Sequence, residues 1–151
     1  MKNFNKSKDT IGLVSKSGQD VDILACFPIG TALISAVLKK AGYDIKVLDL
    51  NLNTNLESDI LNHKIVMLTL SAGPALSFAL DKIEEIKAQK DKIVVVGGPL
   101  VLAMPERVLK ETKADFLLYG DTEESLIKLM KHLEGKEKLE NIKGVGYRKD
   151  N

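Results

Sequence analysis

Short groups of small or hydroxyl-bearing residues follow three of the apolar runs in this sequence. They are Ser71, Ala72 and Gly73 after Ile65–Leu70, Gly97, Gly98 and Pro99 after Ile93–Val96, and Gly120, Asp121 and Thr122 after Phe116–Tyr119. Two adjacent glycines lack two Cβ atoms, so the backbone there can turn sharply or approach another group closely. Each group alone could be only a turn or a helix cap. Their recurrence favours a ligand-binding site.

Residues suited to catalysis or metal binding are scarce by comparison. The histidines are His63 and His132, and the single cysteine is Cys26. One cysteine cannot form an internal disulfide, a cysteine-cage metal site or an iron–sulfur cluster. We expect His63 on the surface, away from the ligand, and His132 near the end of the last helix. A phosphate-binding loop with lysine and a GxGxxG motif are both absent.

Apolar runs alternate with segments of helical periodicity along most of the chain. Strands are predicted at Ile11–Ser15, Ile45–Leu50, Ile65–Leu70, Ile93–Val96 and Phe116–Tyr119, and helices at Ile29–Ala41, Thr54–Leu61, Leu76–Gln89, Pro105–Thr112 and Asp121–Leu133. Nearly continuous apolar strands indicate burial on both faces, as in a parallel sheet. The pattern predicts an α/β fold with a doubly wound, five-stranded parallel sheet of flavodoxin-like (Rossmann-like) order 2-1-3-4-5.

The chain has the size of one domain. We expect residues 1–10 to be a disordered polar N-terminus, residues 11–135 to form the α/β domain, and residues 136–151 to be an exit segment that could add a short strand. Doubly wound sheets bind ligands beyond the carboxyl ends of their strands. All three groups of small residues follow strands, so they should meet at that edge.

Composition excludes several classes of partner. The net charge is +1 and aromatic residues make up only 5% without any tryptophan, which argues against nucleic-acid binding. No apolar run approaches the roughly 20 residues that span a bilayer, and the N-terminal residues are polar. We expect a cytoplasmic protein that binds neither nucleic acid nor membrane.

Two long segments resemble the cobalamin-binding domain found at the N-terminus of cobalamin-dependent radical S-adenosylmethionine enzymes. They are FPIGTALISAVLKKAGYDIKVLDLN and VVVGGPLVLAMPERVLKETKADFLLYGDTEESLIKLMKHLEG. The ending LENIKGVGYRKDN resembles the strand that leaves this domain, so the likeness covers roughly Ile11 to Tyr147. It implies a cobalamin-binding module that does not catalyse alone, from a methyltransferase or cyclase-type enzyme.

The resemblance assigns roles to the small residues. The implied cofactor-binding set is Thr69, Ser71, Ala72, Gly73, Gly97, Gly98, Pro99, Gly120, Asp121 and Thr122. The backbone of Gly97 and Gly98 would lie against the nucleotide tail of cobalamin, where a Cβ would clash with it. The hydroxyls of Thr69 and Ser71 would hydrogen-bond the tail. The loop Gly18–Phe27 would lie under the corrin ring.

The sequence departs from related families in ways that limit the chemistry. The motif Asp-x-His-x-x-Gly, which supplies histidine to cobalt in other cobalamin proteins, is absent, so the resemblance implies base-off cobalamin and no metal ligand from this chain. Leu100 stands where the family often has histidine. An iron–sulfur cluster would belong to a radical S-adenosylmethionine domain that is C-terminal or supplied in trans. The alternatives are a flavodoxin-like interaction or regulatory domain with a vestigial pocket, and a small enzyme for a nucleotide or flavin.

Overall fold

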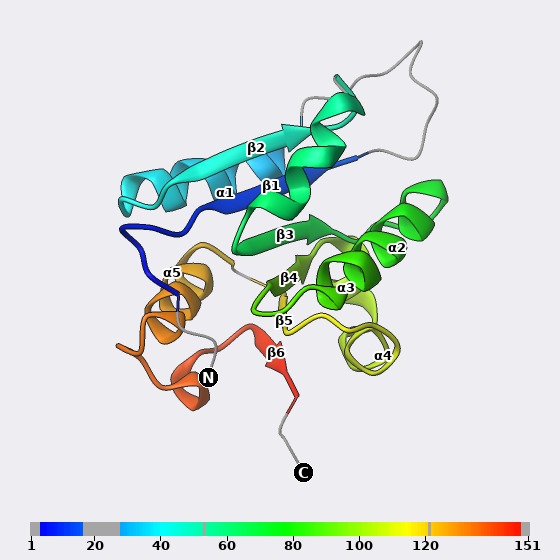
Figure 1. Ribbon diagram of the computed structural model, residues 1–151. Coiled ribbons are helices and arrows are strands. Elements are labelled where there is room, and N and C mark those ends of the chain that lie inside the picture. Colours follow the sequence, from blue (N-terminus) through cyan, green and yellow to red (C-terminus); the bar gives the residue numbers. More distant parts are fainter. Residues whose placement is uncertain (1–3, 17–27, 53, 121, 149–151) are drawn as a thin grey trace.

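The computed structural model describes residues 4–16, 28–52, 54–120 and 122–148. It contains one sheet, whose strands are β1 (Ile11–Ser15), β2 (Ile45–Asp49), β3 (Ile65–Thr69), β4 (Ile93–Gly97), β5 (Phe116–Leu118) and β6 (Val145–Tyr147). The strand order is β2-β1-β3-β4-β5-β6 (Figure 1). The first five strands run parallel in the predicted order 2-1-3-4-5, and β6 pairs antiparallel with β5. The predicted fold class is confirmed, and β6 extends it by one strand.

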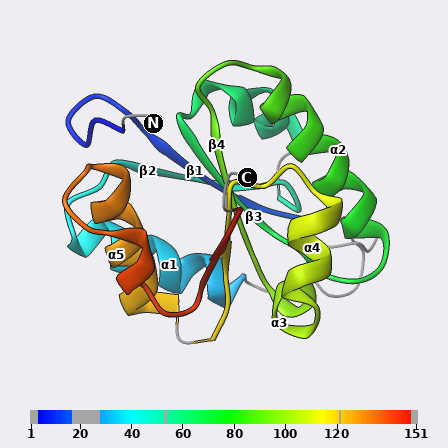
Figure 2. The same cartoon turned by 90° about the horizontal axis from the view of Figure 1, so that it is seen from below.

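Helices cover both faces of the sheet. Figure 2 shows α1 (Ile29–Lys40) and α5 (Thr122–Leu133) on one face and α2 (Pro74–Ala88), α3 (Pro99–Ala103) and α4 (Pro105–Glu111) on the other. The 3₁₀ helices η1 (Thr54–Asn62) and η2 (Leu139–Asn141) lie in connections. Helix α3 was not predicted, because five residues are too short for a periodic pattern. No helix among the described residues has the length and hydropathy needed to cross a membrane.

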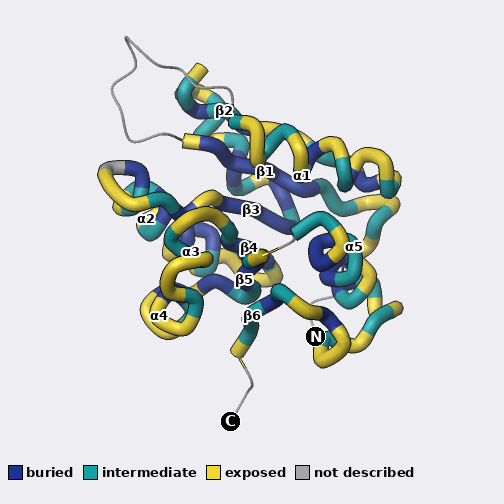
Figure 3. The backbone as a smooth tube through the Cα atoms, turned by 180° about the vertical axis from the view of Figure 1, so that it is seen from behind, coloured by how far each residue is buried: buried dark blue, intermediate teal, exposed yellow. Residues whose placement is uncertain are grey.

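Alternation along the strands divides the core into two clusters. Leu13, Met67 and Val95 face α1 and α5, whereas Leu68 and Val96 face α2, α3 and α4. Successive side chains of a strand point to opposite faces, so a strand that is buried on both sides must be apolar throughout. The central strands β1, β3 and β4 accordingly form the buried centre of the molecule, with exposed helical surfaces outside them (Figure 3).

The N-terminal segment differs from its prediction over the described residues 4–10. Phe4 is only 5% exposed and packs against Tyr43, with ring centroids 6.3 Å apart. The amide of Phe4 donates to the carbonyl of Leu133 at 3.3 Å, and Lys6 Nζ donates to the carbonyl of Ala41 at 2.6 Å. A polar segment that carries one large apolar ring can therefore be fixed by burying that ring.

Candidate functional site

A cleft of about 300 Å³ opens at the carboxyl ends of the strands, between the sheet and the helices α1 and α5. Residues from β1, β3, β4 and β5 form its floor, and the first turns of α1 and α5 form its sides. The switch point between β1 and β3 lies at this edge, as the predicted topology requires. The site is therefore a consequence of strand order, and the side chains only shape it.

Half of the predicted site residues line this cleft. Those that line it are Thr69, Gly97, Gly98, Pro99 and Thr122. Ser71, Ala72 and Gly73 do not, because they lead the chain to α2 on the other face of the sheet. Gly120 is exposed outside the cleft, while Asp121 lies outside the described residues, as do the loop Gly18–Phe27 and Cys26.

Gly98 has a structural role that the sequence did not reveal. Its φ is +105°, in the region that favours glycine, and an added Cβ would lie 2.8 Å from the carbonyl oxygen of Leu70 and 2.8 Å from Cγ2 of Thr69. The Cβ would collide with the chain itself, so a substitution at Gly98 is unfavourable even without a ligand. Close approach of the β3 and β4 tips requires Gly98.

Gly97 is different from its neighbour. An added Cβ would be 3.5 Å from the nearest atom, the carbonyl oxygen of Leu118, which is an ordinary contact. Gly97 follows Val95 by two residues, so that Cβ would point to the same face as Val95, into the cleft. The missing side chain of Gly97 thus leaves space that the cleft uses.

Gly30 and Thr31 line the cleft but were not predicted to do so. A Cβ on Gly30 would meet nothing within 4 Å. The sequence Pro28-Ile29-Gly30-Thr31 predicts a helix start, and the structure places that start beside the tips of the strands. Small residues in the first turn of such a helix were the signal that could have identified them.

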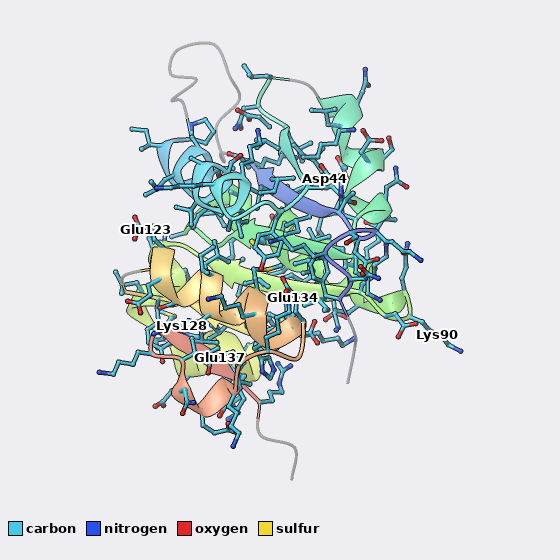
Figure 4. The ribbon with its side chains drawn as sticks, turned by 90° about the vertical axis from the view of Figure 1, so that its left-hand side faces the viewer. Asp44, Lys90, Glu123, Lys128, Glu134 and Glu137 are labelled. Atoms are coloured by element: carbon cyan, nitrogen blue, oxygen red, sulfur yellow. The ribbon has the colours of Figure 1, made fainter. Side chains whose placement is uncertain are left out.

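Polar groups at the opposite, amino end of the sheet are largely paired with one another. Lys92 Nζ donates to the carbonyls of Leu61 at 2.6 Å and His63 at 2.9 Å. Lys87 Nζ lies 2.7 Å from the carboxylate of Asp115. Figure 4 looks onto the side that carries Glu134, together with Asp44 and Lys90 from connections before β2 and β4.

A larger hollow of about 800 Å³ lies at this amino end, between the N-terminal segment, the end of α5 and β6. The charged groups in its wall have partners: the Glu134 carboxylate accepts from the Tyr43 hydroxyl at 2.6 Å and pairs with Lys136 at 2.5 Å. The guanidinium of Arg148 donates to the carbonyls of Leu109, Thr112 and Ala114. These contacts hold the termini of the domain in place.

His63 is buried, so its predicted surface position is wrong. It is 4% exposed, and its Nδ1 lies 2.9 Å from the Thr10 hydroxyl, while Nε2 is buried without a partner among the described residues. Burial lowers the pKa of His63, and the charge of Lys46 lowers it further, against the opposing effect of Asp59. An added Cβ on Gly12 would lie 2.7 Å from the ring, so Gly12 makes room for it.

The described lining of the cleft offers no ligand set for a metal ion. Its described lining contains neither histidine nor cysteine, and the described residues hold no group of three or more acidic, histidine or cysteine side chains placed to bind a metal. His132 lies at the other end of the molecule, near the end of α5 as predicted, with Nδ1 2.9 Å from the carbonyl of Glu137.

Comparison with protein families identifies the domain. A family model described as the B12 binding domain matches residues 15–129, most of the chain. The chain belongs to the B12-binding domain family. The resemblance inferred from the sequence is thereby confirmed. The match begins at Ser15, the last residue of β1, includes β2 to β5 and α1 to α4, and ends within α5.

Relatives of this B12-binding domain are larger proteins. Cytidylyl-2-hydroxyethylphosphonate methyltransferase of Streptomyces wedmorensis is 23% identical over 84% of this chain and 28% of its own length. The radical S-adenosylmethionine methyltransferase TsrM of Kitasatospora setae, solved with cobalamin and a [4Fe-4S] cluster, matches with a TM-score of 0.76 and 19% identity. The cobalamin-dependent radical enzyme OxsB, solved with aqua-cobalamin and S-adenosylmethionine, matches with a TM-score of 0.78 and 21% identity.

The extent of these matches is asymmetric. The chain is covered to 94% in both structural comparisons, but it spans only 29% of the TsrM chain and 21% of the OxsB chain. At these identities the structures show a shared fold. The B12-binding domain corresponds to one part of each relative.

Proposed function

We propose that this domain binds cobalamin, with the nucleotide tail in the cleft between α1, α5 and the sheet. The observation that carries the proposal is the cleft itself, which lies at the switch point of a B12-binding domain and is kept open by Gly30 and Gly97. A volume of about 300 Å³ lies at the low end for a small-molecule pocket. It suits an inserted tail, with the bulky corrin outside over the strand tips.

The residues present fit such a tail. The floor is apolar, and the hydroxyl-bearing residues Thr31, Thr69 and Thr122 line the cleft near the strand tips and the starts of α1 and α5. The N-terminus of α5 at Thr122 suits a phosphate because its first amides are free of helical partners. Ser71, Ala72, Gly73 and Gly120, which are not part of the cleft lining, remain proposed cofactor contacts, and so does Asp121.

The lower base should be detached from cobalt when cobalamin is bound. A base that is inserted in the cleft cannot also coordinate the metal, and the described lining has no histidine to replace it. Bound cobalamin would supply a cobalt centre able to carry an alkyl group. The described residues would bind and orient it.

We also propose that the parent protein is a cobalamin-dependent radical S-adenosylmethionine enzyme. The supporting observations are the relatives TsrM, OxsB and the phosphonate methyltransferase, whose additional length this chain does not span. One cysteine cannot hold an iron–sulfur cluster, so the radical domain and its cluster would be a separate part, C-terminal or in trans.

Equilibrium dialysis of the chain against aquacobalamin tests the binding proposal, and a visible spectrum of the complex tests its mode. We expect saturable binding of one equivalent and the shorter-wavelength absorption of base-off cobalamin. A complex with a base-on spectrum would refute the inserted tail. Absence of binding would refute the function and favour an interaction domain with a vestigial pocket.

A further inference from the structure

The floor of the cleft consists entirely of apolar side chains. It is formed by Leu13, Met67 and Val95 from three neighbouring strands, with Leu118 at its edge and Ile34 of α1 above it. Leu13 is 2% exposed and Val95 1% exposed. We call these five residues the apolar floor. A group that reaches them meets carbon and sulfur atoms of side chains.

The backbone beneath the apolar floor cannot provide hydrogen bonds either. Leu13 pairs with Val47 on one side and Met67 on the other, and Met67 pairs in turn with Val95. Central strands of a parallel sheet use their amides and carbonyls in the ladders on both sides. Leu118 is likewise paired with Val145 across β5 and β6.

Hydroxyl groups occur only toward the mouth of the described cleft. Thr69 is the last residue of β3, Thr122 is the first residue of α5, and Thr31 lies in the first turn of α1. The cleft is therefore polar where the tail would enter and apolar where it would end. Sugar and phosphate match the first zone, and a flat apolar ring matches the second.

We infer that the apolar floor selects corrinoids by their lower base, accepting a benzimidazole and discriminating against a purine. The inference rests on the proposed function. Adenine carries an exocyclic amine and additional ring nitrogens that are hydrogen-bonded in water. Buried polar groups without partners are unfavourable, and the floor offers no partner. The methyl-substituted benzimidazole of cobalamin loses little by comparison and gains apolar contact.

Three ligands test this inference on the 151-residue chain. They are cobalamin, the cobamide that carries adenine as lower base, and cobinamide, which lacks the nucleotide tail. Dissociation constants are measured by absorbance titration under identical conditions. We expect cobalamin to bind most tightly, with the dissociation constant of the adenine-bearing cobamide at least about tenfold higher, a difference of about 1.4 kcal/mol.

The outcomes separate this inference from the proposed function. Equal binding of cobalamin and the adenine-bearing cobamide, with weak binding of cobinamide, would overturn the selectivity and leave the inserted tail intact. Equal binding of all three would overturn both, since the tail would then contribute nothing. Tighter binding of the adenine-bearing cobamide would also overturn the selectivity.

A matched pair of variants tests the apolar floor directly. Met67→Gln keeps a side chain of similar length and adds an amide that can pair with adenine, whereas Met67→Leu keeps the floor apolar. We expect the ratio of the two dissociation constants to fall severalfold in Met67→Gln and to stay unchanged in Met67→Leu. Identical ratios in two folded variants would overturn the assignment to the floor. If Met67→Gln does not fold, the three-ligand comparison on the unaltered chain decides the inference.

Discussion

Polar groups are bonded differently at the carboxyl and amino ends of the sheet. At the carboxyl end, Thr31 and Thr69 border an open cleft with an apolar floor. At the amino end, Lys92 and Asp115 bond to neighbouring parts of the same chain. A site that accepts a ligand needs open space and polar groups that can bond to that ligand. At an end that only holds the domain together, the polar groups can bond to one another. Substitutions at the two ends should therefore affect binding and stability separately.

Gly98→Ala should produce the largest effect, and it tests the limit of this comparison. Gly98 lies at the binding end, yet its Cβ would collide with Leu70 and its φ is +105°. We expect the free energy of unfolding to fall by about 3 kcal/mol, from left-handed strain and overpacking together. Urea unfolding followed by circular dichroism measures it. Gly97→Ala is the control and should change it little; equal losses in both would contradict the distinction between the two glycines.

Gly97→Val should weaken cobalamin binding without comparable damage to the fold. Its side chain would enter the cleft, and valine is favourable at the end of a strand. We expect the dissociation constant to rise at least about tenfold, while unfolding changes by less than about 1 kcal/mol. Dialysis and urea unfolding on the same preparation measure both. Unchanged affinity would show that the glycine serves only the turn.

Asp115→Asn should affect stability at the amino end and leave cobalamin affinity unchanged. The carboxylate accepts from Lys87 and from the amide of Val94 at 2.8 Å, and it is partly buried. Loss of the charge should cost about 1 kcal/mol. Glu111→Gln, which breaks only the exposed pair with Arg107, is the control and should cost less than about 0.5 kcal/mol. A weaker affinity for cobalamin in Asp115→Asn would break the comparison between the two ends.

His63 should give the smallest effect, which is a loss of folding stability as the pH falls. Burial lowers its pKa in the folded protein, so the unfolded chain binds the proton more readily. The contribution of neutral His63 to folding stability is fully present above the unfolded pKa of about 6.5. It is lost as the pH falls toward the lower pKa of the folded protein. Charges of Lys46 and Lys92 oppose protonation, while Asp59 and Asp44 favour it.

Thermal melts between about pH 7 and pH 5 measure this dependence. The melting temperature of the unaltered chain should fall more steeply than that of His63→Gln, and the variant should bind cobalamin normally at neutral pH. His132→Ala, at the end of α5, serves as the comparison and should retain normal binding as well. Parallel pH profiles for the unaltered chain and His63→Gln would rule out the role of His63.

Periodicity and turn residues were enough to predict the sheet, because buried parallel strands such as Ile93–Val96 are apolar on both faces. The alternation of strands and helices predicted a doubly wound sheet, and the count of five strands favoured the order 2-1-3-4-5. The same reasoning placed Gly97 and Thr122 at the carboxyl edge, where both line the cleft, and the family resemblance added Thr69. It could not tell Gly97 from Gly98, because the difference is which atoms each Cβ would meet.

The burial of His63 has a signal in the sequence. Gly12 interrupts an otherwise apolar strand, and a glycine inside a strand often marks the close approach of another group. That group is the His63 ring. Its identity could not be predicted, since it depends on the path of the chain from η1 into β3. The packing of Phe4 could not be predicted either, because Phe4 lies in a polar segment and its partner Tyr43 is distant in sequence.

The antiparallel direction of β6 determines how any following domain could be tethered. Tyr147 pairs with Phe116, the first residue of β5, so polypeptide that continues beyond Arg148 starts at the amino end. A five-residue strand is about 17 Å long, and a connector back to the cleft must span at least that height, roughly five extended residues. If cobalamin occupies the cleft, a domain that is joined through this connector would meet it at an effective concentration set by the length and stiffness of the connector. A longer connector would then lower this effective concentration without altering any contact in the cleft.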